Sequence, residues 1–147
     1  MATARQAIDK ISSWIGLKEG PKVDKVIIDP WNKVMKRSIK SKTTRWCAVT
    51  VASCFIQVKA SGYSKSAVCK TQREYYKAHK RWIAKGQRPA AGYVIFLKGH
   101  EGLVVSTAVS GKSYYVAGNT SNAVKKCSFN WKNPGTEILG YGKPIYK

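Results

Sequence analysis

The spacing of apolar residues changes once along this chain, at Pro89, and that change constrains the fold more than any other feature. Before Pro89, apolar residues recur every three or four positions, which predicts amphipathic helices. After it, short runs rich in β-branched and aromatic residues alternate with turn signals, which predicts strands. Helices followed by antiparallel strands are typical of an α+β domain, with the helices packed on one face of the sheet.

The expected elements follow from these patterns and from helix-end signals. Thr3 and Gln6 have the spacing of a capping box, and Thr43 and Thr44 are good N-cap residues. One helical pattern also carries His79 on its buried-looking face. The expected helices are 3–16, 23–35 (one kinked helix or two), one from 44 to about 62, and 68–83; the expected strands are 93–97, 103–105 with their neighbours, 113–117, 124–129 and 138–146.

Length and charge narrow the possible functions. A chain of 147 residues has room for one domain with a real core, so we expect a single domain over residues 1–147. The formal net charge is +20, from 27 basic and 7 acidic residues. A charge of this size indicates a polyanionic partner: nucleic acid, an anionic membrane or a bacterial wall rich in phosphate polymers. The basic residues form short clusters rather than one long tail, which favours a cationic domain surface.

The four cysteines show no metal-binding spacing, and one of them occupies a special position. Cys47 lies in the first turn of a segment that is apolar on nearly every side, which indicates a buried helix. The positive end of a helix dipole stabilises a thiolate, so Cys47 has reason to be a nucleophile. A buried cysteine is also a common small apolar core residue. The helix alone leaves both interpretations open.

Two further residues complete a possible catalytic set with Cys47. His100 lies at the start of an expected strand, and Asn119 lies at the end of another. A thiol that attacks a carbonyl needs a base, and the base needs a partner that fixes its ring. Asparagine can serve as that partner in a Cys-His-Asn triad. A helix start and two neighbouring strand ends can converge on one edge of a sheet, so we expect these three side chains to meet.

Five motifs in the same order give the chain a resemblance to a known family. Residues 45–49 read RWCAV, 91–96 AGYVIF, 99–105 GHEGLVV, 117–121 AGNTS and 140–144 GYGKP. They are similar to the W-C-A, P-G-D-I-(V/I)-F-F, D-H-V-G-I-V, E-G-N-T-S and G-Y-(A/G)-R-P motifs of the cysteine- and histidine-dependent amidohydrolase/peptidase (CHAP) domains and their NlpC-type relatives. The resemblance extends from about Trp14 to Tyr146.

The resemblance implies a papain-like α+β fold and hydrolysis of an amide bond in bacterial peptidoglycan, as in phage lysins. It implies Cys47 as nucleophile, His100 as base and Asn119 as the orienting residue, with no metal and no cofactor. It also implies substrate-binding roles for Trp46, as a wall of the cleft, and for Gly99 and Gly118, which stand in the matching motifs.

The chain departs from the family pattern at several positions. Ala117 stands where relatives often carry glutamate, so an acidic orienting residue is missing. Glu101 stands where an apolar residue is usual, and strand alternation predicts that it points away from the face of His100. The aspartates usual near Tyr93 and Gly99 are absent. Strand alternation places Ala117 and Asn119 on the same face, so Asn119 can still take the orienting role.

Two classes of function remain open from the sequence. The first is a small peptidoglycan hydrolase, either an amidase or an endopeptidase, acting as a phage lysin or as an antibacterial toxin. The second is a non-catalytic cationic module that binds wall polymers or nucleic acid. Nucleic acid is the less expected partner, because no nucleic-acid motif is present and the aromatic residues have core spacing. We expect a monomer without a membrane span or signal peptide, made in the cytoplasm and acting at the wall after release or delivery.

Overall fold

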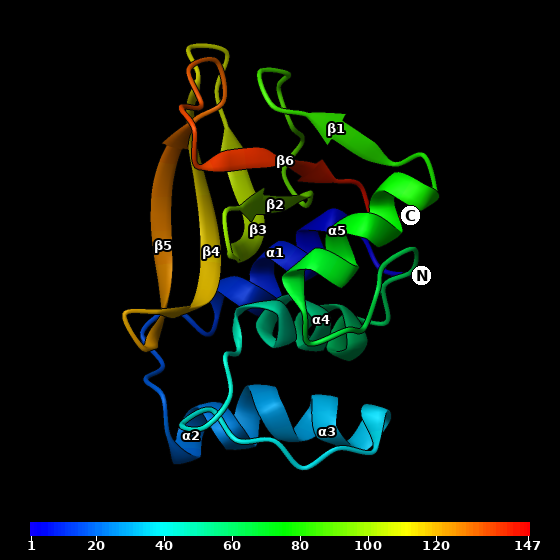
Figure 1. Ribbon diagram of the computed structural model, residues 1–147, viewed down its shortest axis with the longest axis vertical. Helices are drawn as coiled ribbons and strands as arrows, with labels where there is room; N and C mark the ends of the chain where they lie inside the picture. The colour runs from blue at the N-terminus through cyan, green and yellow to red at the C-terminus, as the bar shows by residue number, and fades with distance from the viewer.

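A computed structural model describes all 147 residues and gathers the helices in the first half of the chain and the strands in the second (Figure 1). The helical elements are α1 (Ala4–Ser12), α2 (Pro21–Val23), the π-helical η1 (Asp24–Ile28), α3 (Asp29–Met35), α4 (Cys47–Val58) and α5 (Cys69–Ala78). The strands are β1 (Trp82–Ala84), β2 (Val94–Leu97), β3 (His100–Thr107), β4 (Lys112–Thr120), β5 (Ala123–Asn130) and β6 (Ile138–Gly142). The expected α+β class is confirmed.

The six strands form one antiparallel sheet in the order β1-β6-β2-β3-β4-β5. The β2–β3 hairpin turns through Lys98 and Gly99, so Leu97 pairs with His100 and Phe96 with Glu101. Gly99 has a φ of 66°, a left-handed conformation that glycine adopts without steric cost. This tight turn places His100 at the very start of β3.

Helix α4 is the centre of the molecule, between the sheet and the layer of α2, η1 and α3 (Figure 1). It packs on β3 and β4 on one side and on α1, η1 and α3 on the others. Every residue from 47 to 55 is buried as a result. This position explains the sequence pattern, because a helix surrounded by other elements has no face left for polar side chains. None of the helices combines the length and apolarity needed to cross a bilayer.

Two apolar clusters lie on opposite faces of the sheet. Alternating residues of β2 show the division, since Val94 and Phe96 face the main core under the helices and Ile95 faces the other side. The main core has 20 buried residues and the second cluster has six. The second cluster consists of Ile95, Val104, Tyr115, Ala117, Ile138 and Tyr141. The continuous apolar runs of the sequence reflect burial on both faces.

The helical pattern of residues 23–35 belongs to one continuous segment, in which the π-helical η1 lies between the α-helical α2 and α3. Pro30 has no N–H, so it cannot donate to the carbonyl four residues earlier, that of Val26. The Gln57 side chain of α4 donates to this Val26 carbonyl at 3.0 Å. Ser53 likewise donates to the Ile27 carbonyl at 2.6 Å. Side chains of α4 therefore satisfy carbonyl groups of the π-helical stretch and tie it to the central helix.

Several expected helix ends differ from the structure. The capping box of Thr3 and Gln6 is confirmed, but α1 ends at Ser12. Helix α4 starts at Cys47, with Trp46 in the N-cap position and no side-chain cap, so the expected capping by the threonines at 43 and 44 is wrong. It ends at Val58, four residues before the expected end near Gly62, because Lys59 adopts a left-handed conformation.

The last expected helix is wrong beyond Ala78. Residues 82–84 form β1, where Trp82 pairs with Gly142 of β6. The Trp82 ring also covers Gly140, where a Cβ would collide with the indole. A three-residue strand is too short for its period of two to be visible in the sequence. Because the helix ends earlier, His79 is exposed rather than on a buried face.

Candidate active site

Cys47 is the first residue of α4, and its position is fixed by close packing of the helix start on β4. Its side chain is buried, with 3 % of the residue exposed. On the facing strand, a Cβ at Gly118 would collide with the Thr50 side chain and with the ring of Trp46. Glycine at 118 therefore lets the first turn of α4 approach the sheet. The first-turn N–H groups of a helix have no partner within the helix and favour an anion at this position.

A second thiol lies beside the first. Cys69 is the first residue of α5, and its Sγ atom is 3.5 Å from the Sγ atom of Cys47. Both cysteines are free thiols, and Cys69 is only partly buried. The hydrogen bond from Cys69 is the main reason that the pKa of Cys47 falls from 9.0 to about 4. Burial opposes the lowered pKa, while the His100 ring and the Glu101 backbone N–H support it.

His100 lies next to this thiol and is held from its other side. Its Nε2 atom is 3.2 Å from the hydroxyl oxygen of Thr120, at the end of β4. That contact leaves Nδ1 as the ring nitrogen available to the sulfur. The ring lowers the pKa of Cys47 through hydrogen bonding and through its positive charge. Cys47 and His100, which the sequence predicted to meet, therefore lie together.

Asn119 is placed differently from its expected strand position. It has a φ of 57°, and the pairing of β4 with β5 shifts register between Ala117 and Thr120. This irregularity breaks the alternation by which Ala117 and Asn119 were expected to share a face. The hydrogen bond to the His100 ring comes from the next residue, Thr120, and none joins the ring to Asn119. Asn119 lines a separate depression of about 290 Å³.

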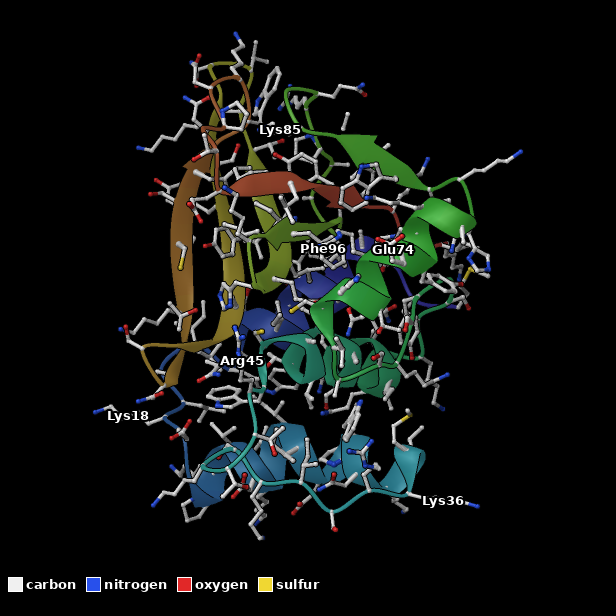
Figure 2. All side chains as sticks on the ribbon, in the orientation of Figure 1. Lys18, Lys36, Arg45, Glu74, Lys85 and Phe96 are labelled. Carbon is white, nitrogen blue, oxygen red and sulfur yellow. The ribbon has the colours of Figure 1, made fainter.

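A cleft of about 460 Å³ opens at the two thiols. Arg37, Arg45 and Lys70 bring positive charge to its walls. The Arg45 guanidinium donates to the carbonyl of Gly99 and so joins the segment before α4 to the β2–β3 turn. Figure 2 shows Arg45 beside the start of α4. The full lining comprises Arg37, Thr44, Arg45, Cys47, residues 67–70 and Gly99.

Of the three expected substrate-binding residues, only Gly99 lies on the cleft. Trp46 is fully buried, and its Nε1 donates to the Glu19 carboxylate at 3.1 Å. A fully buried ring offers no surface to a substrate, so Trp46 supports the start of α4 from inside. Gly118 is also buried and contributes close packing. The cleft wall that the resemblance assigns to Trp46 is formed instead by its neighbour Arg45 and by the other lining residues.

Glu101 is an unusual feature of the site. Glu101 is fully buried, and neither oxygen of its carboxyl group has a hydrogen-bond partner. Burial raises the pKa of Glu101 well above its ordinary value, and the charge of Cys47 raises it further. The carboxyl group also raises the pKa of the neighbouring Cys69 thiol. Strand alternation predicted only that Glu101 points away from the face of His100, and it gave no sign that Glu101 lies beside the thiols.

Three residues of the site were therefore missed by the sequence reasoning: Cys69, Glu101 and Thr120. Cys69 had one available signal, because it begins a helical pattern as Cys47 does. Nothing in a linear pattern shows that two helices begin at the same point in space. Thr120 was missed because a bulge, which strand alternation cannot reveal, exchanges its position with that of Asn119.

This arrangement has the parts of a nucleophilic site. It combines an acidic thiol, an adjacent imidazole whose Nε2 contacts the Thr120 hydroxyl, N–H groups at a helix start and an open cleft beside the thiol. Such a set can attack a carbonyl carbon and pass a proton to the leaving group.

Comparisons with known proteins show a likeness in fold. No protein-family model matches the chain, and no curated protein matches it. The crystal structure of Ly7917 superposes with a TM-score of 0.53 at 14% identity, covering 97% of this chain. A structure described as Ly7917 with the hydrolyzing product of MDP gives the same TM-score and identity. This chain spans 62% and 63% of the length of those two chains. At a sequence identity this low, the comparison shows only that both structures share the fold of this chain.

Proposed function

We propose that this protein is a cysteine-dependent hydrolase of amide bonds in bacterial peptidoglycan, with Cys47 as nucleophile and His100 as base. One observation carries the proposal: a thiol at a helix start, with its pKa lowered to about 4, lines an open cleft and lies beside an imidazole. A structural cysteine needs neither an imidazole neighbour nor access to solvent. Perturbed pKa values of this kind concentrate at functional sites.

The chemistry follows from these two side chains. The Cys47 thiolate attacks the carbonyl carbon of the amide, and the tetrahedral oxyanion accepts hydrogen bonds from N–H groups at the start of α4. The His100 imidazolium gives its proton to the departing amine as the C–N bond breaks. The neutral imidazole then takes a proton from water, and the resulting hydroxide attacks the thioester. The C–S bond breaks, and the thiolate and the imidazolium are restored.

The ring of His100 must keep one orientation through both steps. The contact of its Nε2 with the Thr120 hydroxyl supports Thr120 as the orienting residue. Asn119, the residue that the family resemblance suggests, adjoins Thr120 and remains the alternative for this role. A neutral hydroxyl or amide would fix the ring without adding charge.

Two observations support peptidoglycan as the substrate class. Ly7917, which shares the fold, is described with a hydrolysis product of MDP, the abbreviation of the peptidoglycan fragment muramyl dipeptide. The surface is also strongly cationic, and only Arg5, Arg73 and Lys77 form ion pairs with carboxylates. Figure 2 shows Lys18 and Lys36 pointing outward from different parts of the molecule. Such a surface would attract the protein to an anionic wall.

The place of action would be the bacterial wall, reached by release or by delivery. The bond cleaved would be either the sugar–peptide amide or a peptide bond of the stem or cross-bridge. A phage lysin and an antibacterial toxin would use the same site. Mass spectrometry of the fragments distinguishes the two bonds, since an amidase frees the N-terminus of the first stem residue.

The test is hydrolysis of purified, protein-free peptidoglycan, measured by fragment release. We expect release by the parent protein and none above background by Cys47→Ala. Cys127→Ala is the matched control, because Cys127 lies on β5 and does not line the cleft. Its rate should equal that of the parent. Circular dichroism and thermal melting of both variants report whether the fold is retained.

Two outcomes would reject the proposal. One is hydrolysis by folded Cys47→Ala at the rate of the parent protein. The other is the absence of any fragment from the parent together with binding to wall or to DNA, which would favour the non-catalytic cationic module. Adsorption to the wall should weaken as salt increases in either case, because it depends on screened charges.

A further inference from the structure

The two thiols of the cleft form a pair that the hydrolysis of an amide does not need. Cys47 and Cys69 are 22 positions apart and begin different helices, yet their Sγ atoms lie 3.5 Å apart. The other two cysteines have separate surroundings. Cys54 is buried and donates to the Ala7 carbonyl at 3.3 Å, and Cys127 lies on β5. The fold therefore brings one pair together, and that pair includes the nucleophile.

The pair is close enough to form a bond and open enough to react. A disulfide has an S–S distance of about 2.05 Å, so the sulfurs need to approach by about 1.5 Å. Both cysteines line the cleft of about 460 Å³, and Cys69 is partly exposed. Each occupies the first residue of its helix, where a side chain meets fewer neighbouring turns than in a helix interior.

We propose that Cys47 and Cys69 form a redox-modification site, in which a hydroperoxide oxidises Cys47 and Cys69 then closes a reversible disulfide. In the first step the Cys47 thiolate attacks one peroxide oxygen, the O–O bond breaks, and a sulfenic acid and a hydroxide are formed. In the second step the Cys69 sulfur attacks the sulfenic sulfur. The S–O bond breaks, and the departing hydroxide combines with the Cys69 proton as water. Two thiols and one hydrogen peroxide thus give one disulfide and two waters.

The charges around the pair determine the order of these steps. Cys47 carries the lowered pKa and is the thiolate that reacts first. The pKa of Cys69 is raised mainly by its hydrogen bond to Cys47. Conversion of Cys47 to a neutral sulfenic acid removes that thiolate, so Cys69 ionises more readily at the moment when it is needed.

The consequence for activity rests on the proposed function. While the disulfide is closed, Cys47 has no thiolate and cannot attack a carbonyl. A dithiol reductant restores both thiols by exchange through a mixed disulfide. The disulfide also protects Cys47 from sulfinic and sulfonic acids, which are not reversed by thiols. The hydrolase would therefore be inactive under oxidising conditions and recover on reduction.

The direct test is peptide mapping of the parent protein after treatment with hydrogen peroxide. Free thiols are blocked with iodoacetamide, and the protein is digested with trypsin without reduction. We expect peptide 46–59 joined to peptide 66–70 with the loss of two hydrogens, and fragmentation should place the bond at Cys47 rather than at Cys54. Dithiothreitol should separate the peptides. Cys47 converted to sulfonic acid, with Cys69 still open to alkylation, would overturn the proposal.

Activity measurements complete the test. The parent protein should lose hydrolysis after peroxide and regain most of it with dithiothreitol. Cys69→Ser, measured against its own untreated rate, should lose activity and not regain it. Cys127→Ser should behave as the parent does. Recovery by Cys69→Ser equal to that of the parent would contradict the resolving role. Because the mapping does not require hydrolysis, a linked peptide in a protein without wall activity would reject the proposed function while supporting the redox site.

Discussion

Cys47 and Cys69 occupy the same position in two helices and have opposite acidities. Each is the first residue of its helix, α4 or α5, and each faces the same cleft. The pKa of Cys47 is lowered, and that of Cys69 is raised. The hydrogen bond between the two sulfurs is the largest cause of both shifts. The other neighbours act in the same directions: the imidazole of His100 supports a negative charge on Cys47, whereas the carboxyl of Glu101 opposes one on Cys69.

The comparison teaches that a helix start does not by itself make a nucleophile. The dipole is common to both helices, so it cannot distinguish the two sulfurs. The distinction comes from β3, where two consecutive residues supply an imidazole and a carboxyl group. The first two residues of one strand thus help to select which thiol ionises.

The largest expected effect is that of removing the imidazole. His100→Ala should lower the rate of peptidoglycan hydrolysis by roughly 10²–10⁴-fold, the range for loss of a general acid–base group. The pKa of Cys47 should rise in the same variant, which would reduce the difference between the two thiols. The control is His79→Ala, because the other histidine is exposed at the end of α5. Equal rates for the two variants would contradict the role of His100.

The next largest effect is expected for Glu101→Gln, which should change how the stability of the fold depends on pH. Burial raises the pKa of Glu101 above its ordinary value of 4.5, so between the two pKa values the folded chain holds a proton that the unfolded chain has released. Raising the pH through this window therefore destabilises the parent protein, by about 1.4 kcal/mol for each unit between the two values. Glu101→Gln removes this dependence.

Thermal melting at several pH values measures this effect. The variant and the parent protein should melt alike near pH 4, and Glu101→Gln should melt increasingly higher than the parent as the pH rises. Glu137→Gln, at an exposed carboxylate, is the matched control and should follow the parent at every pH. A difference between Glu101→Gln and the parent that does not change with pH would show that the pKa of Glu101 is the same in the folded and unfolded chains, which would contradict the raised pKa.

The smallest effect separates the two candidates for orienting the ring. Thr120→Val removes the hydroxyl that contacts His100, and loss of one such hydrogen bond corresponds to about 0.5–1.5 kcal/mol, or roughly 2- to 12-fold in kcat. Asn119→Ala should change kcat less, because no hydrogen bond joins Asn119 to the ring. Thermal melting identifies any loss of stability at this bulge. A larger decrease in kcat for Asn119→Ala would restore the role that the family resemblance suggests.

The sequence predicted those features that depend on local pattern. The change of periodicity at Pro89 predicted the α+β class, and the apolar surface of residues 47–56 predicted a buried central helix. The placement of Cys47 at a helix start and of His100 at a strand start was also correct. These features depend on neighbours a few positions away.

The features that escaped prediction depend on contacts between distant segments or on irregular backbone. The pairing of Cys47 with Cys69 requires two helices to begin at one place. The exchange of Thr120 for Asn119 beside His100 requires a bulge in β4. The full burial of Trp46 reflects packing around the start of α4, which periodicity does not describe.

The most direct measurement of the central claim is the pH dependence of alkylation at each thiol of the parent protein. Iodoacetamide reacts with thiolates, and mass spectrometry of peptides 46–59 and 66–70 follows the two sulfurs separately. We predict that Cys47 reacts at a nearly constant rate down to about pH 5, with a midpoint near its pKa of about 4, while Cys69 stays unreactive at neutral pH. A midpoint near the ordinary thiol value of 9.0 for Cys47 would contradict the account.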